Sequence, residues 1–228
     1  MPGRARARAH AFVEDLDAPC LDDDDRHHLE RVLRIGAGDL ITVSDGLGGR
    51  RSCRFGDALE PVGDISVDRA PEQAVAVAFA VVKGDRPEWA VQKLTELGVD
   101  RIVPFLADRS VVRWTGDRAD RHIERLRRVA RSAAMQSRRT WLPEIEPVRS
   151  FTTVASRPGA VLADRDGGGL GVDVPLVLIG PEGGWSDVER AVPIPHIRLG
   201  DTTLQAETAA VSAAVLLTAI RPGGALNA

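Results

Sequence analysis

The residues with the clearest chemical meaning follow a short apolar run at residues 175–179. The glycine-rich loop Gly180–Gly184 comes directly after this run, and Ser186 with Glu189 has the spacing of a capping box, which starts a helix. A strand, a glycine-rich turn and a helix N-terminus place free backbone amides at the carboxyl end of a sheet, where cofactors bind in open α/β folds. The sequence therefore predicts either a cofactor loop or a strand-to-helix turn that is purely structural.

Several common kinds of site are excluded by residue type and spacing. The loop lacks the Gly-Lys-Ser/Thr end of a phosphate-binding P-loop and the Gly-x-Gly-x-x-Gly spacing of a dinucleotide site. Cys20 and Cys53 lack metal-ligand spacing, so we expect free thiols in a reducing, cytoplasmic compartment and no metal site. We also expect no membrane span, because no apolar run approaches the ~20 residues that cross a bilayer, and no secretory signal, because no apolar core follows the basic residues 1–8.

The net charge of −3 conceals an uneven distribution of charge along the chain. Residues 14–25 hold seven acidic side chains and no basic one, whereas residues 101–150 hold twelve arginines against six acidic residues. Guanidinium groups suit bidentate contact with phosphates, so the basic segment indicates a nucleic-acid partner. A solvated helix face, or a codon bias that favours arginine, explains the same pattern.

Short strands and glycine-rich turns are typical of the first part of the chain. The predicted strands cover residues 40–44, 51–55 and 65–68. A short helix is predicted over residues 26–34, where His27 and His28 either contact RNA through stacking or cap and pack the helix. This pattern predicts a small β-barrel-like domain over residues 1–72.

From residue 73 onward, apolar strands alternate with amphipathic helices. The predicted strands cover residues 75–82, 101–105, 160–163, 175–179 and 196–200. The predicted helices cover residues 85–98, 118–136 and 207–220, with one more starting at 186. Such alternation predicts an α/β domain with a parallel sheet over residues 73–228. We expect Trp89 and Trp185 to lie in its core or in a pocket wall.

Five segments, taken in order, resemble one family. They are residues 27–39, 83–99, 109–114, 136–145, and the loop pair 180–184 with 199–209. Together they resemble the RsmE family, the small-subunit ribosomal RNA uridine-N3 methyltransferases of the SPOUT superfamily. The resemblance implies an α/β fold with a C-terminal trefoil knot, preceded by a small PUA-like β-barrel domain that binds RNA.

The resemblance also implies a cofactor and partners. S-adenosylmethionine is expected in the two loops, and the partners are expected to be ribosomal RNA or the small subunit and a second copy of the chain. The residues assigned to the cofactor are Leu178, Ile179, Gly180, Pro181, Glu182, Gly183, Gly184, Leu199, Gly200, Leu204 and Thr208. The residues assigned to RNA are His27, Arg34, Arg86, Arg109, Arg113 and Arg139.

The expected reaction requires a base, because N3 of a uridine carries a proton at neutral pH and must lose it to become a nucleophile. Glu207 and Glu182 are the carboxylates nearest the two loops, and Glu207 is predicted to be catalytic. An acidic residue at a helix N-terminus is also favoured by the helix dipole, which is the structural alternative for Glu207.

The sequence departs from the family pattern in the second loop. That loop usually reads Leu-Gly-x-Arg-x-Leu-Arg-x-Glu-Thr-Ala, and here Thr202 and Gln205 stand at the two arginine positions. Arg138, or a residue of a partner subunit, is predicted to replace the lost cations. The alternative is a divergent paralogue that binds RNA without catalysis or methylates a different RNA position.

Overall fold

The computed structural model describes residues 7–171 and 174–226 of the 228-residue chain. The chain divides into two compact units, each with its own sheet and core. The first unit contains Met1–Ala70 with Ser132–Leu142, and the second contains Pro71–Arg131 with Pro143–Ala228. Within the described residues, no helix is long and apolar enough to cross a membrane.

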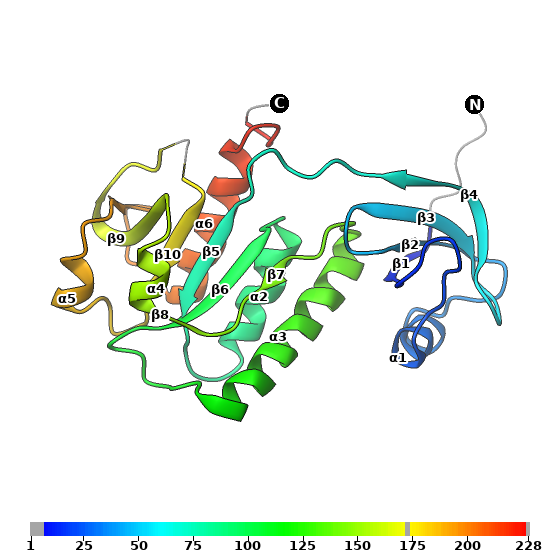
Figure 1. Ribbon diagram of the computed structural model, residues 1–228, viewed down its shortest axis with the longest axis horizontal. Coiled ribbons are helices and arrows are strands. Elements are labelled where there is room, and N and C mark those ends of the chain that lie inside the picture. Colours follow the sequence, from blue (N-terminus) through cyan, green and yellow to red (C-terminus); the bar gives the residue numbers. More distant parts are fainter. Residues whose placement is uncertain (1–6, 172–173, 227–228) are drawn as a thin grey trace. The chain divides into compact units, whose positions relative to one another are not determined.

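The first unit is built on a four-stranded sheet with the order β1-β2-β3-β4 (Figure 1). Its strands are β1 (Ala9–Phe12), β2 (Leu40–Ser44), β3 (Gly49–Arg54) and β4 (Glu60–Val67). β1 and β2 pair in parallel, whereas the β2–β3 and β3–β4 pairs are antiparallel. Between β1 and β2 the chain forms α1 (Asp23–His27) and the π-helical turn η1 (His28–Val32). The fully buried Ile41, Val43 and Cys53 lie in the core of this unit.

Three features of this unit differ from the sequence predictions. β1 was not predicted, because Ala9–Phe12 contains no β-branched residue. The strand predicted at residues 65–68 coincides with the end of β4 up to Val67, and although its apolar and polar residues alternate as in a half-buried strand, every residue of β4 is exposed. The helix predicted over residues 26–34 begins earlier, where the Asp22 carboxylate accepts a hydrogen bond from the backbone N–H of Asp25 at 2.7 Å.

His10 is a buried polar side chain in β1, with 5% of its surface exposed. Its Nδ1 lies 2.8 Å from the hydroxyl of Thr42, and its Nε2 lies 3.1 Å from the carbonyl oxygen of Arg139. A neutral ring with its proton on Nε2 fits both contacts, since that N–H donates to the carbonyl. Burial lowers the pKa of His10 from 6.5 to about 4, against the raising effect of the Arg139 hydrogen bond.

This lowered pKa predicts a loss of stability in mild acid. As the pH falls below 6.5, the unfolded chain takes up a proton on His10 that the folded chain accepts only near pH 4, so folding becomes less favourable over this window. We expect the free energy of unfolding to fall by about 2 kcal/mol more between pH 7 and pH 5 in the wild type than in His10→Gln. Urea denaturation at the two pH values measures this difference, and equal losses in both proteins would contradict it.

The second unit is built on a parallel sheet with the order β11-β9-β10-β5-β6-β7, and β8 also pairs with β6. Its strands are β5 (Ala76–Ala80), β6 (Arg101–Leu106), β7 (Glu144–Ile145), β8 (Arg149–Ser150), β9 (Ala160–Gly168), β10 (Leu176–Ile179) and β11 (His196–Ile197). β5 and β10 are neighbours in register, with Phe79 opposite Ile179. Since all pairs are parallel, the carboxyl ends of β5, β6 and β10 lie at one edge of the sheet.

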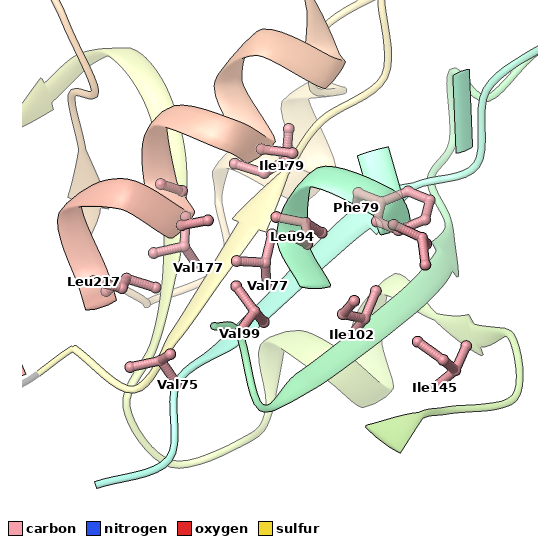
Figure 2. Packing of buried hydrophobic residues seen from close by; sticks show 14 of the residues in the cluster. Val75, Val77, Phe79, Leu94, Val99, Ile102, Ile145, Val177, Ile179 and Leu217 are labelled. Carbon is pink, nitrogen blue, oxygen red and sulfur yellow. The ribbon is translucent and has the colours of Figure 1, made fainter. Parts of the chain in front are cut away.

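Helices cover both faces of this sheet. They are α2 (Arg86–Glu96), α3 (Gly116–Ser137), α4 (Phe151–Ala155), α5 (Asp187–Arg190) and α6 (Ala206–Ile220). Successive side chains of a strand point to opposite faces, so β5 contributes to two cores. Val77 shares one core with Leu94 of α2 and Leu217 of α6 (Figure 2), whereas Ala78 shares the other with Phe151 of α4.

The predicted α/β domain with a parallel sheet is confirmed, and so is the amphipathic character of its longest helix. Ile123, Leu126 and Ala130 of α3 are at most 3% exposed, as the helical periodicity indicated. Trp185 lies in the core with 4% of its surface exposed, whereas Trp89 of α2 is 44% exposed and does not lie in the core.

Candidate functional site

The loop Gly180–Gly184 leaves the carboxyl end of β10 directly over a buried aromatic cluster. Trp185 stacks on Phe105, with ring centroids 6.1 Å apart, and also contacts Phe151. A Cβ atom on Gly180 would lie 2.9 Å from the indole ring of Trp185. Only glycine fits at position 180 without displacing the ring, so the core fixes the path of the loop.

The helix that follows this loop begins at the predicted capping box. The Ser186 hydroxyl accepts from the backbone N–H of Glu189 at 3.2 Å, and the Glu189 carboxylate accepts from the backbone N–H of Ser186 at 2.9 Å. The other oxygen of Glu189, a residue only 2% exposed, accepts from the backbone N–H of Asp108 at 2.9 Å. Glu189 therefore joins the segment after β6 to the start of α5.

Two arginines predicted to contact RNA lie in this segment after β6. Arg109 donates from Nη1 to the carbonyl of Gly183 at 3.2 Å. Arg113 donates to the carbonyls of Ala107 and Asp108 at 3.3 and 3.4 Å. Both side chains therefore support the loops of the site, and their contact with RNA stays a prediction.

One guanidinium group contacts both of the carboxylates that are assigned to the site from the sequence. Arg86, in the first turn of α2, donates from Nη1 to Oε1 of Glu182 at 2.5 Å. Its Nε lies 3.8 Å from Oε1 of Glu207, in the first turn of α6. The second oxygen of Glu207 is buried and has no hydrogen-bond partner in the described part of the chain. The structure thus gathers residues assigned separately to the cofactor, to catalysis and to RNA.

An open cleft of about 610 Å³ lies beside this arrangement. Its lining residues are Lys83, Gly84, Asp85, Arg86, Val111 and Glu182. They come from the segments after β5, β6 and β10, so the cleft is at the carboxyl edge of the sheet, where α/β proteins bind ligands. The sequence predictions missed Lys83 and Val111 as site residues, although Lys83 follows a buried strand closely.

The remaining residues assigned to the cofactor differ in what they expose. The side chains of Leu178 and Ile179 are buried in β10, at 0% and 2% exposure, so only their backbone groups are available to a ligand. Gly200 has open space where a Cβ atom would lie. Leu204 is half-buried, and Thr208 is exposed on α6. Leu199 packs against the core of the second unit.

Four predicted residues belong to the first unit, whereas the cleft residues belong to the second. His27, at the end of α1, and Arg34 are exposed. Arg138 has a positive φ of 58° and donates from Nη2 to the carbonyl of Ala7 at 2.7 Å. The carbonyl of Arg139 accepts the contact from His10 described above. The assigned roles of these four residues stay predictions.

Comparison with known proteins identifies both units. A family described as the RNA methyltransferase domain matches residues 69–218, and an RNA methyltransferase PUA domain matches residues 21–58. The chain is 31% identical to ribosomal RNA small subunit methyltransferase E of Mycobacterium tuberculosis over 220 residues, which cover 85% of this chain and 83% of the relative. It is 29% identical to the protein of the same name from Bacillus subtilis over 225 residues, covering 86% and 88%.

A solved structure supports the same relationship at the level of the fold. Ribosomal RNA small subunit methyltransferase E from Neisseria gonorrhoeae, bound to S-adenosyl methionine, superposes with a TM-score of 0.80 at 24% identity. The match covers 92% of this chain and 96% of that one. The fold class implied by the resemblance in the sequence is therefore confirmed.

Proposed function

Because this chain belongs to the RNA methyltransferase family, we propose that it transfers the methyl group of S-adenosylmethionine to N3 of a uridine in small-subunit ribosomal RNA. The observation that carries the proposal is the arrangement of Arg86, Glu182 and Glu207 beside the glycine-rich loop, next to an open cleft. The names of the relatives supply the substrate class, and the bound neighbour supplies the cofactor.

The loops fit the cofactor because they offer backbone groups and free space. The backbone of Leu178–Gly184 supplies amides and carbonyls at the carboxyl edge of the sheet, and Gly200 leaves room in the second loop. We assign the hydroxyl of Thr208 and the backbone at Leu204 to the same pocket. The sulfonium group of S-adenosylmethionine supplies an already activated methyl group, so the protein has to align the acceptor and deprotonate it.

Glu207 has the contacts expected of the base. One of its oxygens lies near Arg86, and the other is buried and makes no hydrogen bond among the described residues, so no hydrogen bond within the protein competes for the lone pairs that would accept the N3 proton. Arg86 acts as a positioning residue, since it holds both Glu207 and Glu182 from one guanidinium. It thereby provides a cation at a site where Thr202 and Gln205 provide none.

We further propose how the chain is organised for this reaction. Residues 1–72 act as the RNA-binding PUA-like domain and residues 73–228 as the methyltransferase domain. Support comes from the PUA match and from the exposed His27 and Arg34 in the first unit. Arg138 supplies a further cation, and the protein acts as a homodimer in the cytoplasm, where ribosomal RNA is its partner.

Calorimetry with S-adenosylmethionine tests the proposal. We expect saturable binding of one molecule per chain, and transfer of a labelled methyl group to small-subunit RNA. A chain that binds RNA but shows no heat with the cofactor would contradict the proposal. It would favour instead a paralogue that binds RNA without catalysis, as the residues at Thr202 and Gln205 allow.

A further inference from the structure

Four arginines line one side of α3. Arg118, Arg121, Arg125 and Arg128 follow one another at spacings of three or four residues, which places them on the same side of a helix. All four are exposed, and we call them the arginine flank. The apolar residues of α3 face the core instead, so the flank is a surface feature of the second unit.

Most of the flank has no counter-charge. In the part of the chain that the structure describes, Arg125 forms an ion pair with Glu88 at 2.9 Å, and Arg118, Arg121 and Arg128 form none. Glu124, on the same helix, pairs with Arg127 rather than with the flank. Three unpaired guanidinium groups on one helix are therefore available to an anionic partner.

The flank begins close to the cleft. The ion pair between Arg125 and Glu88 joins it to the first turn of α2, two residues after Arg86 of the cleft. Figure 1 shows the first turn of α3 at the edge of the sheet to which β5 and β6 point. Positive charge thus extends from the cleft along α3.

The side chain of His122 lies among these charges. Its ring stacks on Trp114, with centroids 4.2 Å apart and planes 6° from parallel. Burial is the main cause that lowers the pKa of His122, and the charges of Arg118, Arg125 and Arg121 lower it further, while Glu88 opposes them. Three arginines of the flank and Glu88 at the start of α2 therefore act on one side chain.

We propose that the arginine flank binds the phosphate backbone of the RNA strand that carries the target nucleotide. The inference rests on the proposed function, because it takes RNA as the substrate of the cleft. Guanidinium groups bind phosphates through paired hydrogen bonds, and the eleven residues from Arg118 to Arg128 extend about 15 Å along the helix. Over that length the flank contacts successive phosphates at increasing distance from the cleft. It therefore sets the direction in which the RNA strand leaves the site.

The test removes the three unpaired arginines together, as Arg118→Ala, Arg121→Ala and Arg128→Ala. Alanine favours helix, so the variant is expected to fold as the wild type does. We expect its affinity for small-subunit RNA to fall at least tenfold and the slope of log K against log salt to decrease by about 2, since each lost phosphate contact contributes about 0.7. The affinity for S-adenosylmethionine is expected to stay unchanged.

Two control variants accompany this test. The triple lysine variant at the same positions keeps the charge, and its salt slope should stay within one contact of the wild type. Arg165→Ala removes an exposed charge from β9 and should leave RNA binding unchanged. RNA binding is measured without cofactor, so it is separate from catalysis. The inference is overturned by an unchanged salt slope in the alanine triple variant, or by a lysine triple variant whose salt slope falls as much as that of the alanine variant. A wild type that binds RNA but not the cofactor overturns the proposed function alone.

Discussion

Replacing Glu207 by glutamine is expected to lower kcat for methyl transfer by about 100-fold or more, because the amide has the shape of the carboxylate but does not accept the N3 proton. The affinity for S-adenosylmethionine should change little, since the variant keeps the size of the side chain. The measurement is single-turnover transfer of a labelled methyl group to small-subunit RNA, with cofactor affinity determined separately by calorimetry.

Glu182→Gln is the matched control for this variant. It also removes a carboxylate that contacts Arg86, but the side chain of Glu182 is 38% exposed, whereas that of Glu207 is 17% exposed and holds the unpartnered oxygen. We expect Glu182→Gln to alter KM for the cofactor more than kcat. A Glu207→Gln enzyme with wild-type kcat and reduced thermal stability would show that Glu207 is an acid that stabilises the start of α6 and not the base.

The second large effect is expected at Gly180. Gly180→Ala places a methyl group 2.9 Å from the ring of Trp185, which is itself packed against Phe105 and Phe151. Overpacking of this kind costs about 1–3 kcal/mol. The glycine-rich loop has to move to relieve it, so we expect both a lower melting temperature and a loss of S-adenosylmethionine binding. Calorimetry of unfolding and of binding measures the two effects on the same variant.

Substitutions at two other glycines distinguish an effect on protein stability from an effect on cofactor binding. Gly200→Ala and Gly169→Ala each add a methyl group where, apart from the adjacent residues of the chain, no atom of the described residues lies within 4 Å. Gly200→Ala should therefore keep the stability of the wild type but weaken cofactor binding, because we place Gly200 in the pocket. Gly169→Ala should change neither quantity. If Gly180→Ala binds the cofactor as the wild type does, the loop after β10 does not form a wall of the pocket.

The sequence predicted the elements whose signals are local. β10 is a continuous apolar run, α5 begins at a capping box, and α3 has an unbroken apolar face, so each could be recognised without knowledge of its neighbours. β7 and β8 have two residues each, which is too short for any periodicity. At the start of α2, the side chain of Asp85 makes no capping hydrogen bond among the described residues, so the start of this helix is less clearly marked than that of α5.

The site could be predicted only in part, because some of its contacts join residues that are far apart in the sequence. Glycines and a cap locate the loop at Gly180–Gly184, and these are features of the local sequence. The contacts of Arg86 with Glu182 and Glu207 join residues 96 and 121 positions apart, and no local pattern encodes them. Sequence reasoning therefore assigned Arg86 to RNA, whereas the structure places its guanidinium between two carboxylates.

The central claim is tested most directly by mass mapping of small-subunit ribosomal RNA from cells with and without the gene. We predict that one uridine loses its N3 methyl group in the deletion strain. The wild-type gene should restore that modification, and the Glu207→Gln gene should not. A deletion strain in which every N3-methylated uridine of this RNA keeps its methyl group would contradict the account.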